Sequence, residues 1–203
     1  MGTSGKGGNH SLTMNAFARF LLRLFGWTLT QKDPGTRRYV LIFAPHTSNW
    51  DFIIGILAAW ALGLKARWIG KSSLFESPLG PVFRFWGGIP IDRSRPGDMS
   101  KQLAERFAGS DHLVLGIAPE GTRSFSDHWK SGFWHIAKAA NVPVVMAYID
   151  YPRKEVGMGA SFVPSNDLEA DFQQIQAFYA DKRGRFPDKE STIRSRAESE
   201  KAA

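Results

Sequence analysis

A histidine and an aspartate lie close together in the chain, directly after a short apolar segment. His46 and Asp51 are separated by four residues, and the apolar run Tyr39–Ala44, typical of a β-strand, precedes them. Across a tight turn from a strand into a helix, this spacing can bring the carboxylate to one imidazole nitrogen and leave the other free to accept a proton. His46 is therefore a candidate general base, and Asp51 is the residue that would orient it. A structural interpretation is also open, in which Asp51 or Ser48 caps the following helix.

A second polar cluster comes after another apolar segment, His112–Ala118, which is also typical of a buried strand. The cluster combines a carboxylate, a flexible glycine, a hydroxyl and a guanidinium in consecutive residues. An arginine beside backbone N–H groups and a hydroxyl is well suited to bidentate recognition of a phosphate. We therefore predict a phosphate-binding segment made of Glu120, Gly121, Thr122 and Arg123.

Further basic residues stand close to the ends of other predicted elements. Arg93 follows the short extended run Ile89–Ile91, Lys71 follows a candidate strand at Arg67–Gly70, and Lys130 stands just before a candidate helix. Each of these cations alone is typical of solvated surface. Because functional groups in α/β sheets gather outside the carboxyl ends of the strands, their common placement favours a shared anion-binding site.

Between these motifs, apolar strands alternate with helices. This alternation predicts an α/β fold, with a mixed, mostly parallel sheet flanked by helices. Besides the segments named above, we expect strands at 142–149 and 161–164 and helices at 50–62, 80–86, 99–107, 132–140 and 167–182.

The N-terminal part of the chain contains an amphipathic helix with an aromatic face. Between Asn15 and Leu29, apolar residues recur at i, i+3, i+4, i+7 and i+8, and Arg19 and Arg23 lie on the other side. Such a helix suits the plane of a bilayer interface. The alternative is that the same face packs against the protein's own sheet. The residues of this face are Phe17, Phe20, Leu21, Leu24 and Phe25.

Composition limits the classes of function. The 203 residues suffice for one well-buried domain, and the absence of cysteine excludes a thiolate nucleophile, a disulfide and a cysteine-ligated metal. The net charge of +7 favours an anionic partner such as phosphate, nucleic acid or a lipid surface. The basic residues are scattered, so we expect no nucleic-acid partner.

No apolar run reaches the roughly 18 to 20 residues of a membrane-spanning helix. The histidines do not cluster, so no metal site is expected.

Four segments resemble the ordered motifs of the glycerolipid acyltransferases, the family typified by 1-acylglycerol-3-phosphate acyltransferase. In the family's order and with similar spacing, the segments are His46–Asp51, Gly88–Arg93, Pro119–Ser124 and Val142–Val145. The resemblance implies that His46 is the catalytic base and Asp51 its orienting partner. It also implies that Arg93 and the segment Glu120–Arg123 help to bind the glycerol-phosphate part of an acceptor. The two lysines come only from the argument on strand ends.

The resemblance further implies an acyl-transfer reaction. Acyl-CoA or an acyl-carrier protein would supply the acyl group, a lysophospholipid or related lipid would accept it, and no cofactor would be bound. We expect direct attack of the acceptor hydroxyl on the thioester, because the chain has no cysteine and no Gly-x-Ser-x-Gly nucleophile elbow. Two alternatives stay open: a lipid ester hydrolase that uses the same pair of residues, and a non-catalytic protein that binds anionic lipid.

These segments divide the chain into four parts. Residues 1–11 are expected to form a flexible leader, 12–30 a membrane-interface helix, 31–183 the acyltransferase domain and 184–203 a charged, flexible tail. We expect a protein that is peripheral or monotopic on the cytoplasmic face of a membrane. Pro45 departs from the family pattern, in which many members carry a polar residue before the histidine. An acceptor other than lysophosphatidic acid is therefore compatible with the chain.

Overall fold

One mixed β-sheet organises the chain. The strands are β1 Thr28–Gln31, β2 Arg38–Ala44, β3 Ala66–Lys71, β4 Gly88–Ile91, β5 Leu113–Ile117, β6 Val144–Asp150 and β7 Glu155–Phe162. The computed structural model describes residues 7–91 and 96–201, and within these ranges the strands form a seven-stranded sheet in the order β1-β7-β6-β2-β5-β3-β4. Neighbouring strands are parallel except β6 and β7, which are antiparallel. The predicted mixed, mostly parallel sheet is confirmed.

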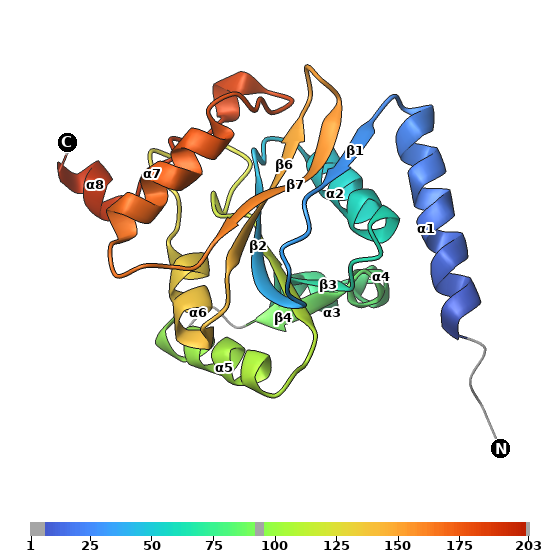
Figure 1. Cartoon of the computed structure of the whole chain (residues 1–203), viewed down its shortest axis with the longest axis horizontal. Coiled ribbons are helices and arrows are strands. Elements are labelled where there is room, and N and C mark those ends of the chain that lie inside the picture. The colour runs from blue at the N-terminus through green and yellow to red at the C-terminus, as the bar shows by residue number, and fades with distance from the viewer. Residues whose placement is uncertain (1–6, 92–95, 202–203) are drawn as a thin grey trace.

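Helices cover both faces of this sheet. In the described ranges they are α1 Gly7–Leu24, α2 Asn49–Ala61, α3 Ser72–Glu76, α4 Gly80–Phe85, α5 Pro96–Ala108, α6 Gly132–Ala140, α7 Leu168–Tyr179, the 3₁₀ turn η1 Pro187–Lys189 and α8 Arg196–Lys201. Figure 1 shows α5, α6 and α7 on one side of the sheet and α1 and α2 on the other. The short helix α3 contacts β3 and the edge strand β4, and α4 contacts β4.

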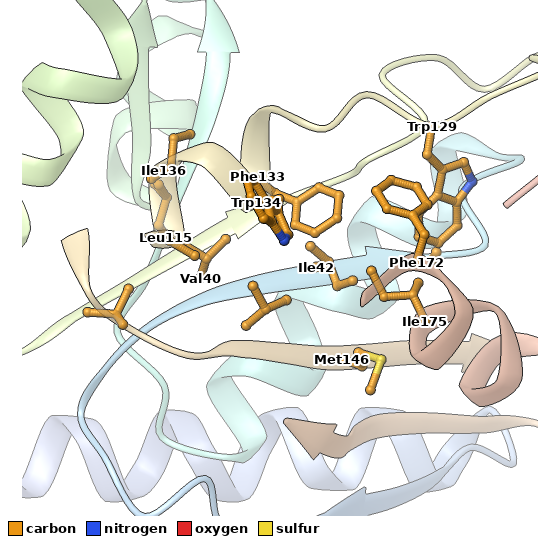
Figure 2. Close-up of a cluster of buried hydrophobic side chains, with 14 of the residues drawn as sticks. Val40, Ile42, Leu115, Trp129, Phe133, Trp134, Ile136, Met146, Phe172 and Ile175 are labelled. Atoms are coloured by element: carbon orange, nitrogen blue, oxygen red, sulfur yellow. The ribbon is translucent and has the colours of Figure 1, made fainter. Parts of the chain in front are cut away.

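The central strand β2 is held by a buried core on each of its faces. Successive side chains of a strand point to opposite faces, so Val40 and Ile42 join the cluster under α5, α6 and α7, whereas Leu41 joins the opposite cluster. Figure 2 shows Val40 and Ile42 among the large side chains of the first cluster, which include Phe172 of α7 and Trp129. Close packing of this kind leaves little room for movement, so the carboxyl end of β2 is a rigid support for the loop into α2.

Helix α1 differs from the prediction at both of its ends. It begins at Gly7 and ends at Leu24, so the expected bounds of 12 and 30 were wrong, and residues 7–11 belong to the helix rather than to a leader. Gly26 has a φ of +77°, its N–H donates to Arg23 O, and the N–H of Trp27 donates to Leu22 O. This pair of bonds is the Schellman arrangement that ends helices at a glycine. The chain is thereby released into β1, which pairs with β7.

The aromatic face of α1 points away from the domain. Ala18 and Leu22 are buried in a cluster with residues of α2, and these two side chains hold the helix in place. By contrast, four of the five residues of the predicted face are more than half exposed: Phe17, Phe20, Leu24 and Phe25. The alternative in which this face packs on the protein's own sheet is therefore wrong for these four residues. No helix within residues 7–91 and 96–201 is both long and apolar enough to cross a membrane.

The segment after residue 183 is not the solvated tail that its composition predicted. Ile193 packs against the main core cluster, and Ser195 is buried and donates its hydroxyl to Glu169. The backbone N–H of Phe186 donates to the hydroxyl of Thr47, next to His46. This part of the chain therefore contributes to the surroundings of the predicted catalytic pair.

Candidate active site

The turn from β2 into α2 carries the predicted catalytic pair and is also a helix cap. Ser48 is the N-cap residue of α2, and its hydroxyl accepts from the N–H of Trp50 at 3.2 Å. The carboxylate of Asp51 reaches back, and its Oδ2 accepts from the N–H groups of Thr47 and Ser48, both at 2.7 Å. The capping interpretation is thus correct, and it does not exclude a second role, because a capping carboxylate has a fixed orientation that a neighbouring group can use.

The same carboxylate oxygen lies beside the imidazole of His46. The distance from His46 Nδ1 to Asp51 Oδ2 is 3.4 Å, with the aspartate fully buried and the histidine 18% exposed. Nδ1 is buried and has no hydrogen bond of normal geometry, so this is a loose contact rather than a well-aligned bond. Catalytic hydrogen bonds are often long before substrate binds. Because Nδ1 faces the carboxylate, Nε2 is the nitrogen left for a substrate.

Asp51 is placed so that it keeps its charge. Burial raises the pKa of its carboxyl, but the close contact with His46 and the hydrogen bonds from the Tyr151 hydroxyl and the Ser48 N–H outweigh burial, and the net pKa lies below the ordinary value. A buried, ionised carboxylate next to Nδ1 favours the imidazole tautomer with the proton on Nδ1. It also stabilises the imidazolium that forms when Nε2 takes up a proton.

Glu120 supports the histidine loop. Its side chain is buried, its Oε1 accepts from the backbone N–H of His46 at 2.7 Å, and its Oε2 accepts from the Ser191 hydroxyl at 3.3 Å. The structure places Glu120 against the His46 loop, and its predicted contact with an acceptor stays a prediction. Burial raises the pKa of the Glu120 carboxyl to about 8, against the opposing effect of these two hydrogen bonds.

Glu120→Gln is expected to remove a pH dependence of stability. The pKa of about 8 in the folded state exceeds the ordinary value of 4.5, so the folded protein binds this proton more tightly than the unfolded chain. Its stabilising contribution is complete below about pH 4.5 and is lost as the pH rises to about 8. At about 1.4 kcal/mol per pKa unit, the effect is on the order of a few kcal/mol. Between about pH 5 and pH 8, the melting temperature of the variant should rise relative to that of wild type. A difference in melting temperature that stays constant with pH would contradict the assignment.

The loop after β5 brings positive charge to the same edge of the sheet. Gly121 has a φ of +68°, and a Cβ at this position would lie 2.8 Å from Lys130 Nζ, so the lysine side chain passes directly over the turn. The exposed guanidinium of Arg123 donates to Asn49 Oδ1, at the first residue of α2. Thr122 is exposed, and its hydroxyl accepts from the N–H of Ser124. These four predicted residues therefore stand beside the His46 loop.

Two of the predicted cations, Lys71 and Arg93, have side chains that the structure does not describe. Lys71 is the last residue of β3 and pairs with Ile91 of β4, so its backbone lies near the carboxyl ends of these strands. Its side chain lies outside the described part of the molecule. Arg93 also lies outside the described residues. Their predicted roles in substrate binding stay predictions.

Sequence reasoning missed two residues that hold the site together. Tyr151 directly follows the last residue of β6, and its hydroxyl donates to Asp51 Oδ1 at 2.6 Å. The rule that singled out His46, a polar group just beyond the carboxyl end of a strand, could have found it. Ser191, which contacts Glu120, stands in the segment that was expected to be a tail, and no sequence signal marks it.

Comparison with known families decides the class of protein. The family model described as Acyltransferase matches residues 10–150, which is more than half of the chain and includes both the His46 loop and the Arg123 loop. The chain belongs to the acyltransferase family. The resemblance to glycerolipid acyltransferases is thereby confirmed, and the protein is an O-acyltransferase.

A solved structure shares the fold of this acyltransferase. It is the 1-acyl-sn-glycerophosphate (LPA) acyltransferase PlsC from Thermotoga maritima, with a TM-score of 0.53 and 14% sequence identity over 84% of this chain and 75% of that chain. At this identity the similarity concerns the fold. A comparison with curated proteins gives no match.

Proposed function

We propose that this acyltransferase moves a fatty acyl group from acyl-CoA or an acyl-carrier protein to a hydroxyl of a lysophospholipid or glycerol-phosphate-type acceptor. In this proposal His46 is the general base and Asp51 orients it. The observation that carries the proposal is the 3.4 Å contact between His46 Nδ1 and the fully buried Asp51 carboxylate. A charged partner on one side of the imidazole prepares the other side to accept a proton.

The reaction is a direct transfer of the acyl group from a thioester sulfur to a hydroxyl oxygen. Nε2 of His46 removes the proton from the acceptor hydroxyl as its oxygen attacks the thioester carbonyl, and a C–O bond forms. The tetrahedral intermediate then collapses, the C–S bond breaks, and the leaving thiolate receives the proton from the imidazolium. The oxyanion of the intermediate requires positive charge or N–H donors nearby. The N–H of Gly121 donates to Ala118 O, so the cation of Lys130, which passes over this turn, is the better candidate.

Arg123 is proposed to bind the phosphate of the acceptor. Its guanidinium is exposed, makes no ion pair of 4 Å or less within the described residues, and lies against Asn49 beside the His46 loop. A guanidinium with free donors is suited to bidentate recognition of phosphate. The head group would then be held at the edge of the site, with the reacting hydroxyl directed to His46.

Arg123→Ala is expected to raise KM for a phosphate-bearing acceptor by roughly tenfold to a hundredfold, the effect of losing a hydrogen bond to a charged group. The KM for an acceptor without a phosphate monoester should rise much less. Initial-rate kinetics with lysophosphatidic acid and monoacylglycerol would measure both values. Arg196→Ala, at an exposed arginine of α8, is the matched control and should behave as wild type. An equal loss with both acceptors would mean that Arg123 acts only through its contact with Asn49.

The exposed face of α1 is proposed to rest on a bilayer surface. Phe17, Phe20 and neighbouring residues expose a continuous apolar face, and Arg19 and Arg23 are exposed on its flank, where they can reach anionic head groups. The apolar surface continues into a groove of about 620 Å³ between α1, the loop after α2 and α4, which includes Phe85. Phe85 is 73% exposed. We therefore propose a peripheral or monotopic protein on the cytoplasmic face of a membrane.

The acceptor and donor classes can be tested with one set of incubations. The purified protein is mixed with lysolipids that differ only in head group, and either acyl-CoA or acyl-carrier protein is added. Mass spectrometry should show a second acyl chain on the lysolipid with a phosphate monoester before it appears on zwitterionic lysolipids. If no lysolipid gains an acyl chain with either donor, the proposed acceptor class is wrong.

A further inference from the structure

We infer that the hydroxyl of Tyr151 is a positioning group for the catalytic pair. It holds the carboxylate of Asp51 in the orientation in which Oδ2 faces His46. This inference rests on the proposed function, because it assumes that His46 and Asp51 act as base and orienting partner.

Tyr151 completes the set of donors around a single carboxylate. Its hydroxyl donates to Asp51 Oδ1 at 2.6 Å. The other oxygen, Oδ2, accepts from the N–H groups of Thr47 and Ser48 and lies 3.4 Å from His46 Nδ1. The backbone donors act on one oxygen alone, so the bond to Oδ1 adds a second point of attachment that opposes rotation of the carboxylate about its Cβ–Cγ bond. Rotation would move Oδ2 away from the imidazole.

The tyrosine ring is itself fixed by its neighbours. The backbone N–H of Tyr151 donates to Arg183 O at 3.0 Å, in the segment after α7. Its ring meets the ring of Trp27 edge-on, with centroids 5.2 Å apart and an interplanar angle of 85°. Trp27 is buried and directly follows the glycine that ends α1. Contacts with Trp27, between α1 and β1, and with Arg183, after α7, therefore fix the position of the Tyr151 ring.

The chemistry of this hydroxyl suits a donor and not a base. Burial, together with the hydrogen bond to Asp51, raises the pKa of Tyr151 far above its ordinary range, and nearby Arg185 opposes this only in part. The phenol therefore keeps its proton throughout the working range of a histidine base. A neutral donor to a buried carboxylate stabilises the charged form of that carboxylate. Tyr151 thus acts on the reaction only through Asp51.

The test uses Tyr151→Phe, which removes one oxygen atom and keeps the ring. We expect kcat to fall about tenfold, the usual effect of losing a hydrogen bond to a charged group, while KM for the acceptor stays within about twofold. The matched control is Tyr148→Phe, which removes a hydroxyl on β6, three residues earlier, that is bonded to Thr30 at 2.8 Å. The control should keep both kcat and KM. Activity is measured at least ten degrees below the lowest melting temperature of the set, so that all variants are folded.

A double-mutant cycle separates positioning from a merely structural role. If Tyr151 acts through Asp51, Tyr151→Phe should cause no more than about a twofold further loss in an Asp51→Asn background, because coupled residues give non-additive effects. The inference is overturned if the two losses multiply, if Tyr151→Phe keeps wild-type kcat, or if the change falls on KM. If His46→Ala and Asp51→Asn retain turnover, the proposed function itself fails. If these two lose turnover and Tyr151→Phe does not, only the inference fails.

Discussion

His46→Ala is expected to lower kcat by about a hundredfold or more, the usual effect of losing a general base. The imidazole makes no hydrogen bond of normal geometry through Nδ1, and the backbone N–H that binds Glu120 is retained in alanine. The variant should therefore melt cooperatively near the wild-type temperature. His112→Ala, at an exposed histidine before β5, is the matched control and should keep full activity.

Asp51→Asn should be nearly as damaging as the loss of the histidine. Asparagine can still accept from the N–H groups that cap α2, so the helix should be preserved. It cannot stabilise an imidazolium, and it favours the wrong tautomer of His46. Steady-state kinetics of the folded variant would measure this loss. Wild-type turnover in both His46→Ala and Asp51→Asn would contradict the assignment of the base.

Phe20→Ser combined with Phe25→Ser is expected to release the protein from anionic vesicles. Both rings are largely exposed, at 60% and 62%, and lie on the outer face at the end of α1. Each methylene buried in a bilayer contributes about 0.8 kcal/mol, so the loss of two rings should weaken binding by well over tenfold. Sedimentation with vesicles at high salt is the measurement. The control variant combines Arg19→Ser with Arg23→Ser. At low salt it should bind vesicles more weakly than wild type, whereas at high salt its binding should differ little from wild type.

The same double phenylalanine variant should keep its activity on a short-chain acceptor dispersed in detergent. His46 lies on the loop between β2 and α2, and the buried contacts of α1 with α2 come from Ala18 and Leu22. Neither contact is changed in the variant. Unchanged vesicle binding, or a lost cooperative melt, would show that the two phenylalanines do not form a membrane-docking face.

The part of the site that depends on local geometry could be predicted from the sequence. Asp51 is the third residue of α2, and the capping geometry of a helix N-terminus turns that side chain back over the preceding loop. His46 stands in that loop, so the contact depends on one turn of the chain. The Arg123 loop reaches the same edge because β2 and β5 are parallel neighbours. The apolar strand segments and the polar residues at their carboxyl ends were enough to predict a shared edge, although not which strands are neighbours.

The contacts that depend on distant residues could not be predicted in the same way. Ser191 contacts Glu120, and Phe186 contacts Thr47, through single polar bonds between segments far apart in the sequence. The composition of this segment is polar, and composition alone predicts solvation. The end of α1 could have been predicted, because Gly26 is a helix-terminating signal. The prediction followed the apolar pattern of the helix and did not use this signal.

The fate of the acyl group in wild-type protein is the most direct test of the proposed acyl transfer. Acyl-CoA or acyl-carrier protein is incubated with lysophosphatidic acid, and the diacylated lipid, free fatty acid and free thiol are quantified together by mass spectrometry and thiol titration. We predict that diacylated lipid and free thiol appear in equal amounts, and that both disappear in His46→Ala. Free fatty acid in place of the diacylated lipid would indicate a hydrolase. Lipid binding with none of the three products would indicate a non-catalytic lipid-binding protein, and either result would contradict the proposed function.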